Sequence, residues 1–458
     1  MIDVITFLIS LIYQNLSIQI CLGLLIFYLI YYLKYGNYIF IQKNSYTQGK
    51  HRIGKTLPAY PNGWYIILRS HELKKGESKY VDIHGESLVV FRGNNGKSYV
   101  LNAYCPHLGA NLGVNGRVVH DSCVQCPFHA WTFDGETGNC VMGKDKIQKE
   151  GIKYEYVFDS QQSCEFKPTK TEKIKIRKYY SKEHSGYIYV WFSSKVGERY
   201  DHESENNTEE ERRKFTTPYE PLDLTEHLKR LHPRGHSVNK INAHVSDIAE
   251  NGGDMLHFLY VHTNIIPYLV KGSWDAQWIR GDDPQLYEKM TLSSERENTF
   301  RMNLLNKFLN EKNKKHIGVI SLRSKLTILN TIRDQHFFTL TGFQLGSGIV
   351  YLFIQGTFFE VMFVQYVETK EKYQQTLYHD IYCNWETPYW LSALQLRLET
   401  GQVLNDGVIW DNKKFGYTAY FNKKTNECDS YLIKWRQWFI QFYDGCEEEE
   451  EKKNSLQW

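Results

Sequence analysis

The sequence has no strong excess of charge of either sign. Its 55 lysine and arginine residues nearly balance 52 aspartate and glutamate residues, giving a formal net charge of +3. Without a basic stripe interleaved with aromatic residues, the chain is not typical of proteins that bind nucleic acid. Its nine cysteines lack the spacing of a secreted disulfide framework, so we expect the main body in a reducing compartment. A glycine-rich dinucleotide fingerprint on a strand–helix turn is missing as well.

Charged residues are also missing between Val4 and Leu33. Roughly 20 apolar residues are enough for a helix to cross a bilayer, so this run predicts a transmembrane anchor over residues 1–35. The alternative is a re-entrant hairpin split at Gln14. No basic region precedes the run and no small-residue cleavage site follows it, which argues against a signal peptide. Lysine and arginine residues follow the run but do not precede it, so the positive-inside rule places the body of the protein in the cytosol.

Two short arms, Cys105-x-His107 and Cys126-x-x-His129, each combine one cysteine with one histidine. These are the ligands of a Rieske [2Fe–2S] cluster, in which the cysteines hold one iron and the histidines hold the other. A proline after each cysteine stiffens the loop, and Gly109 allows backbone N–H groups to approach the cluster sulfurs. A structural zinc site is the alternative, but zinc sites usually pair like ligands within each arm. The arms therefore predict a one-electron carrier.

The chain after the apolar run divides into regions of different pattern. Short runs of β-branched and aromatic residues from 58 to about 195 predict an all-β domain whose loops carry the two arms. A polar, charged stretch follows, and then a region of mixed strand-like and helical patterns up to residue 443. In that region we expect strands near Gly348–Gln355 and Phe358–Val367, and helices near Val245–Tyr260, Trp390–Leu404 and Tyr431–Tyr443.

A second set of metal-binding residue types occurs in the mixed region, as Asp254-x-x-His257-x₄-His262. Two neutral imidazoles with a carboxylate nearby suit a non-haem iron. An ideal helix turns about 140° between residues five apart, so both histidines face one metal only if the helix bulges or unwinds. We expect Asp254 to hydrogen-bond a histidine, and Asp406 to be the third ligand, with Asp411 as the competitor. The alternative is a pair of histidines near a helix end that form hydrogen bonds within the protein and bind no metal.

With both sites in place, residues 58–443 resemble the Rieske-type non-haem iron oxygenases. The resemblance implies that His257, His262 and Asp406 ligate the iron. It also implies that Asp254 connects a cluster histidine of one subunit to an iron ligand of its neighbour in a homotrimer. The implied fold is α+β, with one transmembrane helix, an all-β Rieske domain and a mixed α/β catalytic domain with a central antiparallel sheet of the helix-grip type. The expected regions are the anchor 1–35, a juxtamembrane linker 36–57, the Rieske domain 58–197, a charged linker 198–214, the catalytic domain 215–443 and an acidic tail 444–458.

Within that family, the apolar N-terminal run, the stretch Asn405–Lys413 and the ending Trp435–Tyr443 resemble the cholesterol 7-desaturases of the Neverland type. Bacterial 3-ketosteroid 9α-hydroxylases share much of the catalytic-domain pattern. The resemblance implies a membrane enzyme, expected in the endoplasmic reticulum, that uses a [2Fe–2S] cluster, a mononuclear Fe(II), O₂ and electrons from NAD(P)H through a separate reductase. Its expected reaction is C7–C8 desaturation of cholesterol to 7-dehydrocholesterol. The alternatives are a different sterol oxidation (ring hydroxylation or side-chain dealkylation) and a membrane-tethered Rieske electron carrier.

Overall fold

The structure is a computed structural model of the 458-residue chain. It describes residues 19–20, 22–24, 26, 39–43, 57–141, 174–194, 217–266, 270–328, 331–356, 359–413 and 427–444. The expected anchor, charged linker and acidic tail lie wholly or almost wholly outside these residues. Within them, no helix combines the length and the apolar character needed to cross a membrane.

The first part of the described chain, residues 57–194, is a β domain. Its strands are rich in β-branched and aromatic residues, which favour the extended conformation. Side chains such as Val89, Val100 and Ile188 are completely or almost completely buried. Three antiparallel three-stranded sheets result, and the short 3₁₀ helix η1 (Ser70–Glu72) connects the first strand of the first sheet to the second sheet. The sheets are β2 (Gly63–Arg69), β10 (Tyr187–Phe192) and β9 (Ser181–His184); β3 (Ser78–Ile83), β4 (Glu86–Arg92) and β5 (Ser98–Asn102); and β6 (Arg117–Val119), β7 (Cys123–Gln125) and β8 (Thr132–Asp134).

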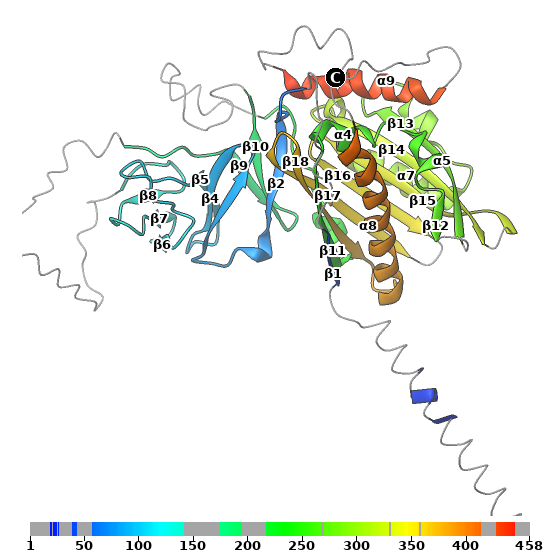
Figure 1. The fold of residues 1–458 in the computed structure, drawn as a ribbon, viewed down its shortest axis with the longest axis horizontal. Helices are drawn as coiled ribbons and strands as arrows, with labels where there is room; N and C mark the ends of the chain where they lie inside the picture. Colours follow the sequence, from blue (N-terminus) through cyan, green and yellow to red (C-terminus); the bar gives the residue numbers. More distant parts are fainter. Residues whose placement is uncertain are drawn as a thin grey trace, which may run out of the picture.

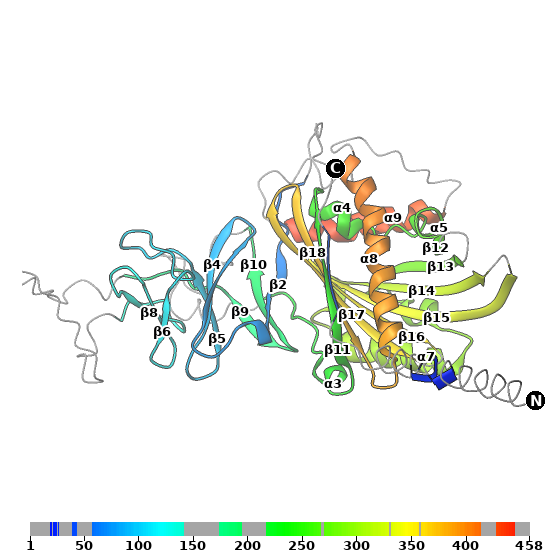
Figure 2. The ribbon, with the colours of Figure 1, turned by 60° about the horizontal axis from the view of Figure 1, so that its bottom comes forward.

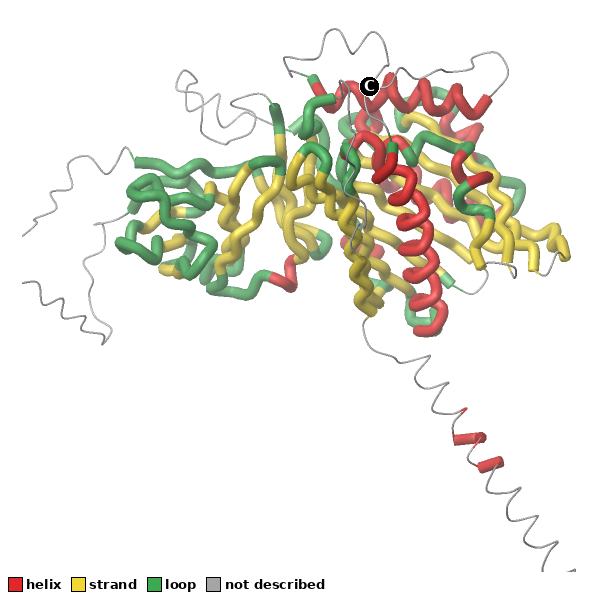
Figure 3. The backbone as a smooth tube through the Cα atoms, in the orientation of Figure 1, coloured by secondary structure: helices red, strands yellow, loops and turns green. Residues whose placement is uncertain are grey.

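The second part, from residue 217 to 444, is an α/β domain built on one nine-stranded sheet of the described residues (Figures 1 and 3). Neighbouring strands are antiparallel, except that the edge strand β1 runs parallel to β11. In sheet order the strands are β1 (Ile39–Lys43), β11 (His232–Ile241), β18 (Gln374–Cys383), β17 (Glu360–Glu371), β16 (Ile349–Gly356), β15 (Thr331–Leu345), β14 (Ile317–Ile328), β13 (Val270–Arg280) and β12 (Asn264–Ile266).

Strand β1 differs from the expectation of a linker over residues 36–57. The run Ile-Phe-Ile is a good strand former, and it pairs in register with β11 from Ile39 opposite Gly235 to Lys43 opposite Asn239. Ile41 packs against the apolar cluster under helix α8 (Tyr389–Asn412). The segment just after the apolar N-terminal run is therefore part of the α/β domain.

Both faces of the large sheet are covered. Successive residues of a strand point to opposite faces. Phe363 of β17 packs in a cluster with α8, whereas Val364 packs in the main core with α7 and with Trp64 of the β domain. Helix α8 therefore covers one face (Figure 2), and α7 and the β domain cover the other. The helices of this domain are α3 (Thr225–Leu228), α4 (Val245–Glu250), α5 (His257–Tyr260), α6 (Leu286–Met290), α7 (Glu295–Phe308), η3 (Lys314–His316), α8 (Tyr389–Asn412), α9 (Glu427–Phe439) and η4 (Ile440–Tyr443).

A buried ion pair joins the two domains. Arg69 of β2 forms two hydrogen bonds to Asp380 of β18, at 2.8 and 2.5 Å, and both side chains are nearly inaccessible to solvent. Tyr187 of β10 donates to the same carboxylate at 2.8 Å. Because an uncompensated buried charge is costly, the pair fixes the position of β2 against β18.

Candidate metal centres

The two arms of the β domain fold into the same turn. In each loop the cysteine N–H donates to the carbonyl five residues later, at 2.9 Å for Cys105 and 2.7 Å for Cys126. The N–H four residues after each cysteine donates back to the cysteine carbonyl. That fourth residue has a positive φ in both loops, 71° at Gly109 and 57° at Ala130. Glycine is the residue best suited to this conformation, which explains the glycine in the first arm.

The four predicted ligands of the cluster differ in their exposure to solvent. Cys105 and Cys126 are only 2% and 3% exposed, whereas His107 and His129 are exposed. The two imidazole rings lie 4.7 Å apart between centroids. Burial raises the pKa of the Cys105 thiol to about 11, with a further contribution from the neighbouring Cys126. Two buried thiols and two exposed imidazoles at adjacent loop tips fit a cluster with an inner iron on cysteines and an outer iron on histidines.

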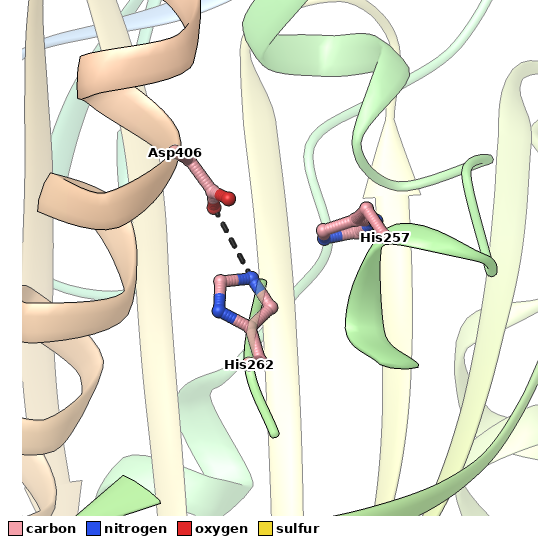
Figure 4. A group of neighbouring side chains, drawn as sticks. All are labelled: His257, His262 and Asp406. Carbon is pink, nitrogen blue, oxygen red and sulfur yellow. Dashed lines mark ion pairs between the residues drawn. The ribbon is translucent and has the colours of Figure 1, made fainter. Parts of the chain in front are cut away.

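The second site brings three predicted ligands together across the α/β domain (Figure 4). His257, His262 and Asp406 each offer one ligand atom, and these atoms lie within 4.8 Å of one another. Asp406 comes from α8, and its Oδ2 is 3.3 Å from Nε2 of His262. Both of these side chains are buried. Two imidazoles and one carboxylate on one side of a metal leave other positions open, which is the arrangement of non-haem iron oxygenases. We call these three residues the metal triad.

The expected helix over Val245–Tyr260 is interrupted before His257, and the helical turn that follows ends between His257 and His262. Helix α4 ends at Glu250, and α5 begins only at His257 and ends before His262. The interruption contains Gly253, where a Cβ atom would lie 2.4 Å from the Cβ of Trp435 on α9. Only glycine allows that approach. The prediction of one continuous helix was therefore wrong, and the expected unwinding between the histidines is confirmed.

Asp254 holds His257 rather than joining the metal triad. Its Oδ1 accepts hydrogen bonds from the backbone N–H groups of Leu256 and His257, at 3.1 and 3.3 Å, in an Asx-type turn. Its carbonyl oxygen contacts Nδ1 of His257. A proton on Nδ1 leaves Nε2 of His257 as the metal-binding atom. Burial lowers the pKa of His257, although Asp406 and Asp254 oppose this, so the ring favours its neutral form.

Asp411, the competing third ligand, points elsewhere. Its Oδ1 accepts the backbone N–H of Asn242 at 2.9 Å, at the end of β11. Asp406 and Asp411 are five residues apart on α8, so they lie on different sides of the helix. Within the described residues, the group of metal-binding side chains contains Asp406 and not Asp411.

A cavity of about 430 Å³ lies between α8 and the sheet, with the metal triad in its wall. Its volume lies within the ~300–1,000 Å³ of small-molecule sites. Most lining side chains are aliphatic or aromatic, from β13 to β18 and α8. Among the polar lining residues missed in the sequence are Gln365, His379 and Glu399. The one signal for Glu399 is its position seven residues before Asp406, on the same stripe of a helix.

Comparison with known proteins agrees with both domains. The Rieske [2Fe-2S] domain family matches residues 63–150, and the 3-Ketosteroid 9alpha-hydroxylase C-terminal domain family matches residues 190–443. The chain is 30% identical to Cholesterol 7-desaturase nvd 1 of Ciona intestinalis, over 86% of this chain and 71% of that protein. It is also 30% identical to Cholesterol 7-desaturase nvd of Drosophila melanogaster, over 85% of this chain and 76% of that one.

Among solved structures, the fold is similar to that of dicamba monooxygenase bound to 3,6-dichlorosalicylic acid. The TM-score is 0.50 at 12% identity, over 84% of this chain and 97% of the other. The protein is therefore a Rieske non-haem iron oxidoreductase that uses a [2Fe–2S] cluster and a mononuclear iron. The chain belongs to the cholesterol 7-desaturase family.

Proposed function

We propose that the protein is a sterol desaturase that converts cholesterol to 7-dehydrocholesterol. The observation that carries the proposal is the large apolar cavity whose wall contains the metal triad. A sterol is a rigid apolar body with one hydroxyl, and it suits such a cavity. The names of the relatives support C7–C8 desaturation as the reaction.

The reaction consumes one O₂ and one NAD(P)H with a proton, and it yields the diene, two waters and NAD(P)⁺. Cys105, Cys126, His107 and His129 would hold the cluster, and the metal triad would hold the iron. Iron bound there supplies a site for O₂ activation next to the substrate. The chain's own residues supply the rest. The aliphatic and aromatic walls exclude water from the reacting carbon, and Asp254 fixes the ring of His257.

We further propose a homotrimer in which the cluster of one subunit serves the iron of its neighbour. Within one chain, the cluster ligands lie in the β5–β6 and β7–β8 loops, at the side of the β domain away from α5 and α8 (Figure 1). The exposed rings of His107 and His129 are accessible to a neighbouring subunit. Asp254, partly exposed beside His257, would form the bridge between the centres.

Electrons would reach the cluster from NAD(P)H through a separate reductase. The chain would be attached to the endoplasmic reticulum membrane by the apolar run in residues 1–35, with its body in the cytosol. The charge-free stretch from Val4 to Leu33 and the lysines after it support this proposal. A sterol partitions into the bilayer, so an enzyme tethered there draws its substrate from a concentrated source.

The test is mass spectrometry of sterols from cells that express the chain, with and without added cholesterol. We expect 7-dehydrocholesterol only when cholesterol is supplied. The matched control is His257→Ala, which should yield no product but keep a normal Rieske absorption spectrum. A hydroxylated or dealkylated sterol as the main product would replace desaturation with one of those reactions. No oxidised sterol from iron-loaded wild-type protein would refute the function.

A further inference from the structure

A small polar group interrupts the apolar wall of the cavity. Gln365 of β17 and His379 of β18 are directly opposite each other in the strand register, so their side chains point to the same face. That face is the one covered by α8, which carries Glu399. All three residues line the same cavity as the metal triad. We call Gln365, His379 and Glu399 the polar subsite.

The hydrogen bonds within the polar subsite are incomplete. Nε2 of Gln365 donates to Oε1 of Glu399 at 2.7 Å. Nε2 of His379 is 3.7 Å from the same oxygen, which is too long for a hydrogen bond. Nδ1 of His379 is buried and has no hydrogen-bond partner among the described residues. Buried polar groups are normally satisfied, so this group calls for an additional partner.

The chemistry of the group defines that partner. Burial lowers the pKa of His379 to about 3, so its imidazole is neutral at physiological pH and offers one N–H and one acceptor nitrogen. Burial raises the pKa of Glu399 to about 7. Whichever protonation state Glu399 adopts, a hydroxyl matches it, because a hydroxyl both donates and accepts. A hydroxyl beside Glu399 and Nε2 of His379 would form hydrogen bonds with both of these groups, which are too far apart to bond each other.

The position of the group relative to the metal triad suits a sterol. Glu399 and Asp406 are seven residues apart on α8, on nearly the same side of the helix and about 10 Å apart along its axis. Among the described residues lining the cavity, these are the only two acidic side chains. In a sterol, the 3-hydroxyl and carbon 7 lie on adjacent fused rings. A hydroxyl at Glu399 would therefore bring carbon 7 toward the triad, and the rest of the sterol would lie on apolar walls.

We propose that Glu399, assisted by Gln365 and His379, binds the 3-hydroxyl of the sterol and thereby sets which carbon faces the metal triad. This inference rests on the proposed function and adds its specificity determinant. Glu399 accepts the hydroxyl hydrogen, and an N–H of His379 donates to the hydroxyl oxygen. Gln365 holds the carboxylate in place from the neighbouring strand.

The experiment compares two sterols in the full-length holoenzyme. Dissociation constants are measured for cholesterol and for cholest-5-ene, which lacks only the hydroxyl, by competition against labelled cholesterol. The two hydrogen bonds, from the hydroxyl to Glu399 and from His379 to the hydroxyl, correspond together to about a ten- to hundredfold preference for cholesterol in the wild type. In Glu399→Leu we expect this preference to fall to near one, through weaker cholesterol binding alone. Arg397→Leu, an exposed position on the same helix, should keep the wild-type ratio.

Several outcomes overturn the inference. An unchanged ratio in Glu399→Leu would refute the polar subsite. An equal loss of affinity for both sterols together with a lower iron content would also refute it, because Glu399 would then act through the metal. If Glu399→Leu does not fold, Glu399→Gln and Gln365→Leu replace it, each with an expected several-fold drop in the ratio. Wild-type protein that converts cholesterol but shows no preference would refute the subsite alone. Wild-type protein that neither binds nor converts cholesterol would refute the proposed function together with it.

Discussion

Replacing Asp254 separates its two expected roles, which are to shape the turn that orients His257 and to connect the cluster of one subunit to the iron of its neighbour. Its Oδ1 accepts two backbone N–H groups, at 3.1 and 3.3 Å, and these hydrogen bonds shape the turn that orients His257. Asp254→Ala removes both, and the loss of such a local side-chain acceptor costs about 1–2 kcal/mol. At about 1.4 kcal/mol per tenfold, this corresponds to roughly a five- to thirtyfold weaker iron affinity, which overlaps the ~10–100-fold range of residues that orient metal ligands. Asp254→Asn keeps the acceptor oxygen, so its iron affinity should stay close to that of the wild type.

The assay is iron per chain during titration with a chelator, with the Rieske spectrum as the internal control. A single-turnover measurement of electron transfer from the cluster to the iron is made on the same samples. We expect Asp254→Asn to retain its iron but transfer electrons more slowly, because the proposed bridge between subunits uses the carboxylate. An Asp254→Ala protein with wild-type iron affinity would show that the turn does not orient His257. Wild-type rates of electron transfer in Asp254→Asn would contradict the proposed bridge between subunits.

Three further predictions address other parts of the molecule. Asp406→Asn should lose the mononuclear iron and keep the Rieske spectrum, whereas Asp411→Asn should keep both; metal analysis showing the reverse would exchange the two roles. Arg69→Met should lower the free energy of unfolding by about 3–5 kcal/mol in urea titrations, because it leaves Asp380 charged and buried. The double variant that also carries Asp380→Leu should recover part of that loss. Additive effects of the two substitutions would contradict a coupled pair. His379 has a pKa of about 3 in the folded state, below its unfolded value, so its contribution to stability is complete above about pH 6.5 and is lost as pH falls toward 3. Between pH 7 and 5 the wild type should lose about 2 kcal/mol more than His379→Gln, and parallel pH profiles would rule this out.

The sequence was most informative where a few residue types must lie close together along the chain. The four cluster ligands fall within 25 residues, and the structure places them at two adjacent loop tips, as their order predicts. The runs Trp64–Leu68, Tyr80–Ile83, Ser87–Phe91, Tyr99–Leu101 and Tyr187–Phe192 predict the strands β2, β3, β4, β5 and β10 to within about two residues, because β-branched and aromatic runs between turns leave little ambiguity. A closing strand is also expected over Ile174–Lys178, but that segment forms only isolated bridges. Four short strands were missed. The strands β6, β7 and β8 have only three residues each, and β9 (Ser181–His184) is polar and pairs only at a sheet edge.

The sequence was less informative where tertiary contacts decide the backbone. The apolar pattern of Val245–Tyr260 fits one helix, but the contact between Gly253 and Trp435 and the Asx turn at Asp254 interrupt it. Trp435 is distant in sequence, so no local pattern contains this information. The same holds for β1, whose partner β11 lies almost two hundred residues later. Glu399 was missed for another reason, because a glutamate on a helix is usually solvated and only the sheet opposite shows that this one is enclosed.

Helix α8 connects the two functional features of the cavity. It carries Asp406 of the metal triad and Glu399 of the polar subsite, and a continuous α-helix fixes their separation at about 1.5 Å per residue. Loops would allow that separation to vary, but the packed helix is held along its length by Leu396 and Val403 against the sheet. If Glu399 holds the hydroxyl, the number of helical residues between Glu399 and Asp406 determines which carbon of the sterol is oxidised. Inserting or deleting one residue between the two acids would rotate them onto different sides of the helix and should abolish oxidation at carbon 7, while substitutions on the exposed face of α8 should leave it unchanged.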